Sequence, residues 1–363
     1  MAKIHLIAPA GSCRRFVEQL GLASADTLIA HIQGIVGSDF AVTGDADLIA
    51  AAEDDDRGGR GDDRERAADI QRALADQEVA AIVALRGGAW FTRILQLIDF
   101  FVLDRRARPV SVFGFSELTT LVNIVGAHAN GRGIYDLCPG SLPSGLRRHA
   151  RMHLGLSGEP EGRSPADDWM KSRLLPEFAA YFLDVISIIE GRGTCRGLTA
   201  ERVAGELPDR CEATFVGGNL CVLTTLLGSE AHRDVVNPAG RWLVIEDINE
   251  KPERIDRFLA HLTLAGFWDL CAGILVGDFH LQDRQFTAAV AAMLAYHLPP
   301  DCSVPILTTT QVGHVWPMSP LPLHVPLTLE RSGENDYSIR WSNLRFDSPT
   351  AEAMGRPTED SDF

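Results

Sequence analysis

Short apolar, β-prone runs alternate with amphipathic stretches through the first 130 residues of this 363-residue chain. The expected strands are residues 3–8, 79–85 and 110–113, and the expected helices are residues 14–22, 66–76 and 91–101, with a further short strand at 33–35. Strand and helix repeat at intervals of roughly 25–35 residues, the length of a βα unit. This rhythm predicts a parallel sheet flanked by helices, with functional groups at the carboxyl ends of its strands.

A serine lies in the turn after one of these strands. The strand at 110–113 leads through Gly114-Phe115-Ser116-Glu117 into a helical pattern that begins at Leu118. Such a turn lifts the serine above the sheet edge, and the first amides of the helix can stabilise an oxyanion. Ser116 could equally be only a helix N-cap. The glycine usual two residues after a nucleophilic serine is replaced by Leu118, so the turn alone leaves both interpretations open.

Composition excludes several classes of protein. Hydrophobic residues make up 45% and charged residues 23% of the chain, which supports a large core. The formal net charge of −15 argues against a nucleic-acid partner. The seven cysteines form no C-x-x-C pair, which favours reduced thiols in a cytoplasmic protein over disulfides or a metal site. We expect no metal and no cofactor.

The apolar stretches are poor candidates for targeting or membrane segments. The apolar run at residues 4–8 is too short for the hydrophobic region of a signal peptide. The longest apolar stretch, residues 258–277, contains His261 and Asp269 and is more typical of a helix, a turn and a strand than of a membrane span. We therefore expect no membrane partner.

Two regions break the βα rhythm. Residues 45–66 are rich in Asp, Glu and Gly, and they predict a solvated, mobile surface loop. The regular acidic order of a calcium loop is absent there. Residues 138–170 are rich in Pro and Gly and predict a loop-rich crossover.

The second half of the chain predicts a second domain. Its expected helices are residues 174–189, 221–227, 254–265 and 286–297. Its expected strands are residues 214–218, 241–245, 272–276 and 304–308. A connecting segment is expected at 194–202 and a terminal hairpin from 321–329 and 337–341. The predicted organisation is an α/β domain at 1–140, a crossover at 141–195, a C-terminal domain at 196–346 and a tail at 347–363.

Two further residues at strand ends complete a possible catalytic set. Glu246 follows four apolar residues, and a carboxylate there is costly unless it is paired. Glu246 could be a helix cap or an ion-pair partner of Arg254 or Arg257, and His314 could be an ordinary loop histidine. Together with Ser116, however, they supply the nucleophile, the base and the orienting acid that acyl transfer requires.

Seven motifs occur in one order along the chain: Ile7-Ala8-Pro9-Ala10-Gly11-Ser12, residues 63–70, Arg86-Gly87-Gly88, Gly114-Phe115-Ser116-Glu117, Gly217-Gly218-Asn219-Leu220, residues 243–250 with 254–257, and Gly313-His314 with Pro322-Leu323. In this order they resemble the LD-carboxypeptidase family of serine peptidases. That family includes murein tetrapeptide carboxypeptidases and microcin C self-immunity peptidases.

The resemblance implies a flavodoxin-like N-terminal domain and a smaller β-rich C-terminal domain that carries the acid and the base. It implies Ser116 as nucleophile, His314 as general base and Glu246 as orienting acid. The oxyanion hole would be the backbone N–H groups of Glu117 and Gly88. Arg86 and Gly87 would lie near the terminal carboxylate of the substrate, although Arg86 could instead form a structural ion pair. Homodimers are usual in the family.

Four features depart from the family pattern, and one of them is the acidic stretch near residues 45–62, which resembles an insertion. Glu117 stands where Asp or Asn is usual, so a role for its side chain is open. Trp90 occupies a position after Gly-Gly where smaller residues are common, and we count it among the candidate substrate-binding residues. The long crossover resembles that of the microcin-immunity branch, in which an aromatic residue can stack on a nucleotide. Trp169 is the candidate here, and packing in a core or interface is the alternative.

The expected function is hydrolysis of a peptide or amide bond next to a free carboxylate. The first substrate is a murein L,D-peptide bond before a terminal D-Ala, and the second is a peptidyl-nucleotide of the microcin type. A non-catalytic binding protein on the same scaffold is a third hypothesis. Nucleotide or phosphate binding at the Gly-rich strand ends is weaker, because no G-x-G-x-x-G or Walker pattern is present.

Overall fold

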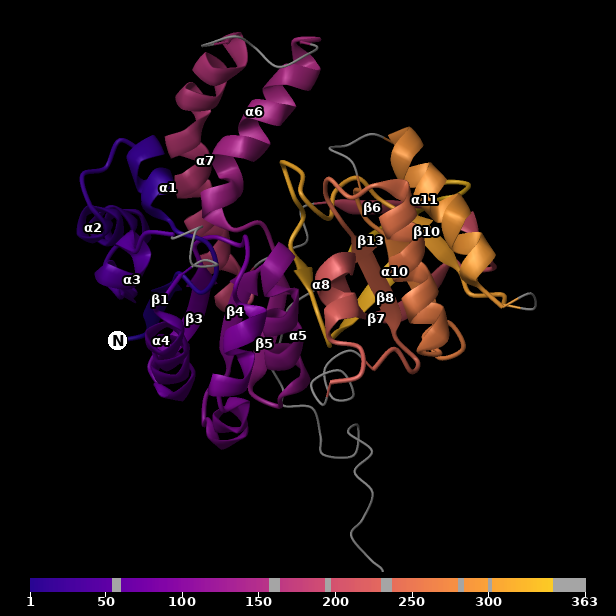
Figure 1. The fold of residues 1–363 in the computed structure, drawn as a ribbon, viewed down its shortest axis with the longest axis horizontal. Coiled ribbons are helices and arrows are strands. Elements are labelled where there is room, and N and C mark those ends of the chain that lie inside the picture. Colours follow the sequence, from indigo (N-terminus) through magenta and orange to yellow (C-terminus); the bar gives the residue numbers. More distant parts are fainter. Residues whose placement is uncertain are drawn as a thin grey trace, which may run out of the picture.

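The computed structural model describes residues 1–53, 60–156, 164–192, 197–229, 237–279, 284–299 and 302–341. The chain forms two β-structures that lie side by side (Figure 1). One is a six-stranded sheet in the order β11-β5-β4-β3-β1-β2, and the other is a closed barrel in the order β10-β6-β13-β12-β7-β8-β9. The predicted α/β fold with a smaller β-rich C-terminal domain is confirmed.

The N-terminal domain is a parallel sheet flanked by helices. Its strands are β1 (Lys3–Ile7), β2 (Ala41–Gly44), β3 (Val79–Ala84), β4 (Val110–Gly114) and β5 (Gly131–Tyr135). Its helices are α1 (Arg14–Gln19), α2 (Ala25–Val36), α3 (Ala46–Ala50), α4 (Asp63–Ala75) and α5 (Thr119–Ala127). These five strands pair in parallel in the order 2-1-3-4-5, which is the flavodoxin-like order.

Several local predictions in this domain were wrong. The strand expected at residues 33–35 is part of α2, which Ser24 begins with a capping box and which buries Leu28, Ile32 and Val36 at helical spacing. The helix expected at 91–101 is two 3₁₀ helices, η2 (Thr92–Leu97) and η3 (Phe100–Arg105). Strands β2 and β5 were not predicted from the sequence.

The acidic stretch at 45–66 is built into the domain rather than forming one surface loop. Asp45 accepts from two amides at the start of α3 and so caps that helix. Arg60 is buried and donates to the carbonyl oxygens of Ala8, Ala10 and Leu48. Residues 54–59 lie outside the described residues. The described part of the stretch therefore holds the end of β1 in place.

The expected loop-rich crossover contains two long helices. α6 (Leu142–His153) and α7 (Pro165–Ile189) pack side by side as an arm that extends from the N-terminal domain (Figure 1). Pro143 and Pro165 lie in the first turns of these helices, where the missing N–H of proline costs nothing. The prolines thus mark helix starts rather than loops. Residues 157–163 lie outside the described residues.

The C-terminal domain is the closed barrel. Its strands are β6 (Leu198–Ala204), β7 (Arg210–Asn219), β8 (Trp242–Glu246), β9 (Gly273–Val276), β10 (Ile306–Thr308), β12 (Pro326–Arg331) and β13 (Asp336–Arg340); its helices are α8 (Leu220–Thr225), α10 (Pro252–Leu264) and α11 (Arg284–His297). β6 replaces most of the connecting segment expected at 194–202. β12 and β13 form a hairpin, whereas β11 (Leu321–Pro322) pairs with β5 in the other sheet.

A buried polar contact joins the two domains. The Asn123 side chain on α5 donates to the Gly217 carbonyl oxygen (2.9 Å) and accepts from the Gly217 N–H (3.0 Å). One turn earlier, the Thr119 hydroxyl accepts from the N–H of Asn219 (2.9 Å). Buried backbone groups need such partners. The helix that follows Ser116 is therefore held directly on a strand of the barrel.

In the part of the chain that the structure describes, no helix has both the length and the hydropathy needed to cross a membrane.

Candidate active site

Ser116 lies in the turn between β4 and α5. Its φ of 60° is in the left-handed region, which a non-glycine residue adopts only when the surrounding structure enforces it. β4 before it is buried along its whole length, and the 3₁₀ turn η4 (Ser116–Leu118) follows at once. The sheet and the helix thus hold the serine in a strained turn of the kind that exposes a nucleophile.

The structure brings together the three residues that the strand ends predict. His314 Nε2 lies 3.0 Å from Ser116 Oγ. His314 Nδ1 lies 2.9 Å from Oε2 of Glu246. Ser116 comes from the N-terminal sheet, whereas Glu246 and His314 come from the barrel, so the site is assembled across the domain boundary.

Glu246 is fully buried at the end of β8. Its Oε1 accepts a hydrogen bond of 2.6 Å from the Tyr135 hydroxyl, and its Oε2 faces His314. Arg254, one of the alternative partners considered from the sequence, pairs with Glu250 instead (2.8 Å). Among the described residues, the hydrogen-bond partners of this carboxylate are therefore His314 and Tyr135.

The loop after β10 fixes the imidazole of His314. The ring centroid lies 4.8 Å from that of Phe115, and the main-chain oxygen accepts from Arg148 (2.8 Å). Gly313 before it has a φ of 124°, and a Cβ there would lie 3.0 Å from Oε2 of Glu246. Only glycine allows this close approach of the backbone to the carboxylate.

The loop that contains Gly87 and Gly88 runs beside the serine. A Cβ on Gly87 would lie 3.4 Å from the Cβ of Ser116, and the Gly87 carbonyl oxygen accepts from the N–H of Gly11 (3.0 Å). Gly88 has a φ of 120°. Gly87, Gly88, Ser116 and His314 all line one cavity. The loop therefore places backbone groups close to the hydroxyl.

The Glu117 side chain braces this loop from the other side. Its Oε1 accepts from the N–H groups of Phe91 (2.9 Å) and Thr92 (3.1 Å) at the start of η2. Burial raises the pKa of the Glu117 carboxyl, while these amide bonds act in the opposite direction. Glu117 is not among the residues that line the cavity. Its side chain joins the serine turn to the chain that follows Gly88.

The cavity beside Ser116 has a volume of about 440 Å³ and an arginine-rich wall. Arg15, Arg86 and Arg147 all line it. Arg86 also donates to the Ser12 carbonyl oxygen (2.5 Å) and lies 3.6 Å from Glu53, so it takes part in a structural ion pair. A cavity of about 500 Å³ beside β6 and β10 contains none of the predicted site residues.

The two tryptophans proposed from the sequence do not line the cavity. Trp90 has a φ of 69° and is half-buried, and its carbonyl oxygen accepts from Arg66 (3.3 Å). Trp169 lies on α7 and packs against Trp316 from the loop after β10, with ring centroids 6.0 Å apart. These contacts agree with the alternative that Trp169 is a packing residue.

Within the described ranges, no three His, Cys, Asp or Glu side chains are close enough to hold a metal ion. Six cysteines in those ranges are free thiols, and burial raises the pKa of Cys13 and Cys138 to about 12. Such thiols are neutral and unreactive at ordinary pH.

Asp247 and Tyr135 lie next to Glu246, and neither was predicted from the sequence as a site residue. Burial, followed by the charge of Glu246, raises the pKa of Asp247 to about 6. The Asp247 carboxylate accepts from the side chain of Asn219 (3.2 Å) and the N–H of Cys221 (2.8 Å), so it fixes the start of α8. Tyr135 ends β5, and a prediction of that strand would have placed it at the same sheet edge as Ser116.

The scaffold and the site define a two-domain α/β protein whose serine, histidine and carboxylate have the spatial arrangement used by serine hydrolases. Family models for the LD-carboxypeptidase N-terminal domain and C-terminal domain match residues 4–136 and 212–329. The chain belongs to the LD-carboxypeptidase family, and it is a serine-type carboxypeptidase.

Curated relatives and solved structures agree with this assignment. A probable murein peptide carboxypeptidase of Bacillus subtilis is 29% identical over 72% of this chain and 72% of its own length. The murein tetrapeptide carboxypeptidase of Pseudomonas aeruginosa is 26% identical over 65% and 71%. The microcin C7 self-immunity protein MccF of Escherichia coli is 22% identical over 75% and 77%.

Two solved structures share the fold across nearly the whole chain. MccF in its wild-type apo state has a TM-score of 0.63 at 17% identity and covers 94% of this chain and 97% of its own. A muramoyltetrapeptide carboxypeptidase from Oxalobacter formigenes has a TM-score of 0.60 at 20% identity, with 93% and 98% covered.

The bracing contact of Glu117 is testable by a pair of substitutions. Glu117→Ala removes the acceptor for two amides, and we expect kcat/KM to fall about ten- to hundredfold because the loop carrying Gly88 shifts. Glu117→Gln keeps a carbonyl oxygen at the same reach and should stay close to wild type. If both variants fold but lose activity equally, the charge of Glu117 is needed and the bracing account is wrong.

Proposed function

We propose that this chain is a serine carboxypeptidase in which Ser116 is the nucleophile, His314 the general base and Glu246 the orienting acid. The observation that supports this most is the hydrogen-bonded series from Ser116 Oγ through both nitrogens of His314 to Glu246, with distances of 3.0 and 2.9 Å. A serine hydroxyl is unreactive at its own pKa and needs a base at this distance.

In the first half-reaction, His314 Nε2 takes the Ser116 proton as Oγ bonds to the carbonyl carbon of the substrate. The carbonyl oxygen becomes an oxyanion. The backbone N–H groups of Glu117 and Gly88 would donate to it, since Glu117 lies in the first turn after the serine and Gly88 lines the same cavity.

The imidazolium then gives its proton to the leaving amine, the C–N bond breaks and an acyl-enzyme ester remains on Ser116. Water attacks this ester, with His314 again accepting a proton, and the acid product leaves as Ser116 recovers its own. Glu246 stays in contact with His314 Nδ1 throughout. It holds the imidazole in one tautomer and stabilises its charged form.

The wall of the cavity supports a substrate that carries a free carboxylate next to the cleaved bond. Arg15 and Arg147 line the cavity together with Arg86, and a guanidinium binds a carboxylate with two parallel hydrogen bonds. The first substrate is an L,D-peptide bond in a murein tetrapeptide, whose hydrolysis releases D-Ala. The names of the relatives from Bacillus subtilis and Pseudomonas aeruginosa support this choice.

A peptidyl-nucleotide of the microcin type is the second candidate. Related MccF structures hold glutamyl sulfamoyl guanosine and aspartyl sulfamoyl adenosine. In this chain Trp169 packs against Trp316 and does not line the cavity, so it offers no stacking surface there. We therefore rank this substrate second. A non-catalytic binding protein ranks third, because the side chains of all three reactive residues are joined in one series of hydrogen bonds.

The cytoplasmic location predicted from the cysteines and the homodimer that the family resemblance implies remain predictions. The free cysteines in the described ranges support a reducing compartment.

Replacement of the proposed nucleophile tests the reaction and its substrate together. Ser116→Ala should lower kcat by about 10⁴-fold or more, with an unchanged unfolding temperature. Wild-type protein is given a murein tetrapeptide and, in parallel, an aminoacyl sulfamoyl adenosine. We expect release of D-Ala from the first to be faster. Activity that survives in Ser116→Ala refutes the mechanism, and faster cleavage of the nucleotide reverses the order of the substrates.

Two adjacent arginines provide a matched test of carboxylate binding. Arg15 lines the cavity, whereas Arg14 lines a different hollow and lies 3.5 Å from Glu18. Arg15→Ala should raise KM about tenfold with little change in kcat, because it removes a charge-assisted contact present in ground and transition states alike. Arg14→Ala should leave both constants unchanged. Equal KM values for the two variants would exclude Arg15 as a carboxylate ligand.

A further inference from the structure

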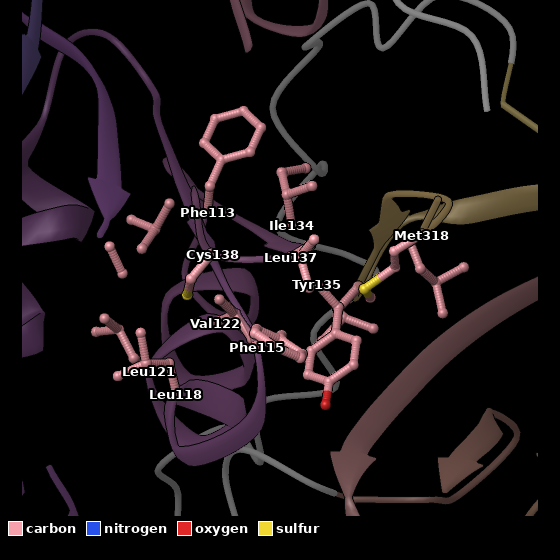
Figure 2. Packing of buried hydrophobic residues seen from close by; sticks show 14 of the residues in the cluster. Phe113, Phe115, Leu118, Leu121, Val122, Ile134, Tyr135, Leu137, Cys138 and Met318 are labelled. Carbon is pink, nitrogen blue, oxygen red and sulfur yellow. The ribbon is translucent and has the colours of Figure 1, made fainter. Parts of the chain in front are cut away.

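Tyr135 connects the proposed nucleophile with the proposed acid. It lies at the end of β5 and is completely buried, and its ring packs edge-on against Phe115 with centroids 6.3 Å apart. Figure 2 shows the ring at the side of the buried hydrophobic cluster, with its oxygen pointing away from the labelled aliphatic side chains. That hydroxyl donates to Glu246 Oε1 (2.6 Å) and accepts from the N–H of Ser116 (3.3 Å).

The barrel leaves space for this ring by using a glycine. Gly218, near the end of β7, has a φ of 142°, and a Cβ there would lie 2.7 Å from a ring carbon of Tyr135. Tyr135 therefore crosses the domain boundary into a recess that only glycine leaves open. The phenol of one domain and the carboxylate of the other are held at a fixed separation.

The Tyr135 hydroxyl is the hydrogen-bond donor to one of the two oxygens of a buried carboxylate. Glu246 is 0% exposed, and among the described residues His314 contacts one oxygen and Tyr135 the other. A buried carboxylate without donors is costly, and it lowers that cost by binding a proton. The short bond from Tyr135 supplies a donor to Oε1 and fixes the rotation of the carboxylate plane.

Resting on the proposed function, we propose that Tyr135 is a positioning residue of the reaction: its hydroxyl holds the Glu246 carboxylate in alignment so that His314 can accept the proton of Ser116. Through the amide of Ser116, the same oxygen also fixes the strained serine turn relative to the acid. Tyr135 acts through its neighbours and does not contact the reacting bond.

The test is Tyr135→Phe, which keeps the ring and removes one oxygen. We expect kcat to fall about ten- to hundredfold and KM to change little, because the contact positions the reacting groups and does not bind the substrate. Tyr181→Phe is the matched control. It removes another buried hydroxyl, one that has no hydrogen-bond partner among the described residues. The control should keep the wild-type kcat and KM. Both variants should fold, and their unfolding temperatures are measured alongside.

Glu246→Gln separates this inference from the proposed function. If Tyr135 acts through Glu246, the substitutions are non-additive, and Tyr135→Phe has little further effect on kcat in the Glu246→Gln protein. A folded Tyr135→Phe with wild-type kcat, or with an undiminished effect in the double variant, overturns the positioning role. If Glu246→Gln alone keeps wild-type kcat, the proposed triad itself is wrong.

Discussion

The buried carboxylate of Glu246 is the interaction on which the rest of the site depends. It is the last residue of a fully buried strand, and its two oxygens face a histidine of its own domain and a tyrosine of the other. A charge in such a place is stable only if donors in good geometry offset its loss of water. The positions of His314 and Tyr135 are therefore constrained together, and with them the distance between the two domains.

The domain interface meets that constraint with polar contacts next to the site. Asn123 and Thr119 on α5 bind the backbone of Gly217 and Asn219 at the end of β7. The helix that carries these residues begins immediately after Ser116. The contacts that dock the barrel thus also fix the Ser116 turn, and a site divided between two domains becomes one rigid arrangement.

The strand ends and the order of motifs in the sequence were enough to predict the parallel sheet and to select Ser116, Glu246 and His314. Other features depended on contacts between distant segments. Gly131 and Gly133 lie in β5, and both must be glycine because a Cβ at either would collide with the backbone of α5, a contact that the local sequence does not reveal. Tyr135 was missed with that strand. The direction of the Glu117 side chain depends on two amides in η2, 25 residues or more away along the chain.

The most direct measurement of the central claim is covalent labelling of the serine. A fluorophosphonate reacts with a serine hydroxyl only where a base and an oxyanion site activate it. Incubation followed by peptide mass spectrometry should show one adduct, on Ser116, and the adduct should be absent from folded His314→Ala protein. An unlabelled Ser116 in a preparation that still hydrolyses its substrate, or an adduct on a different residue that abolishes activity, would contradict the account.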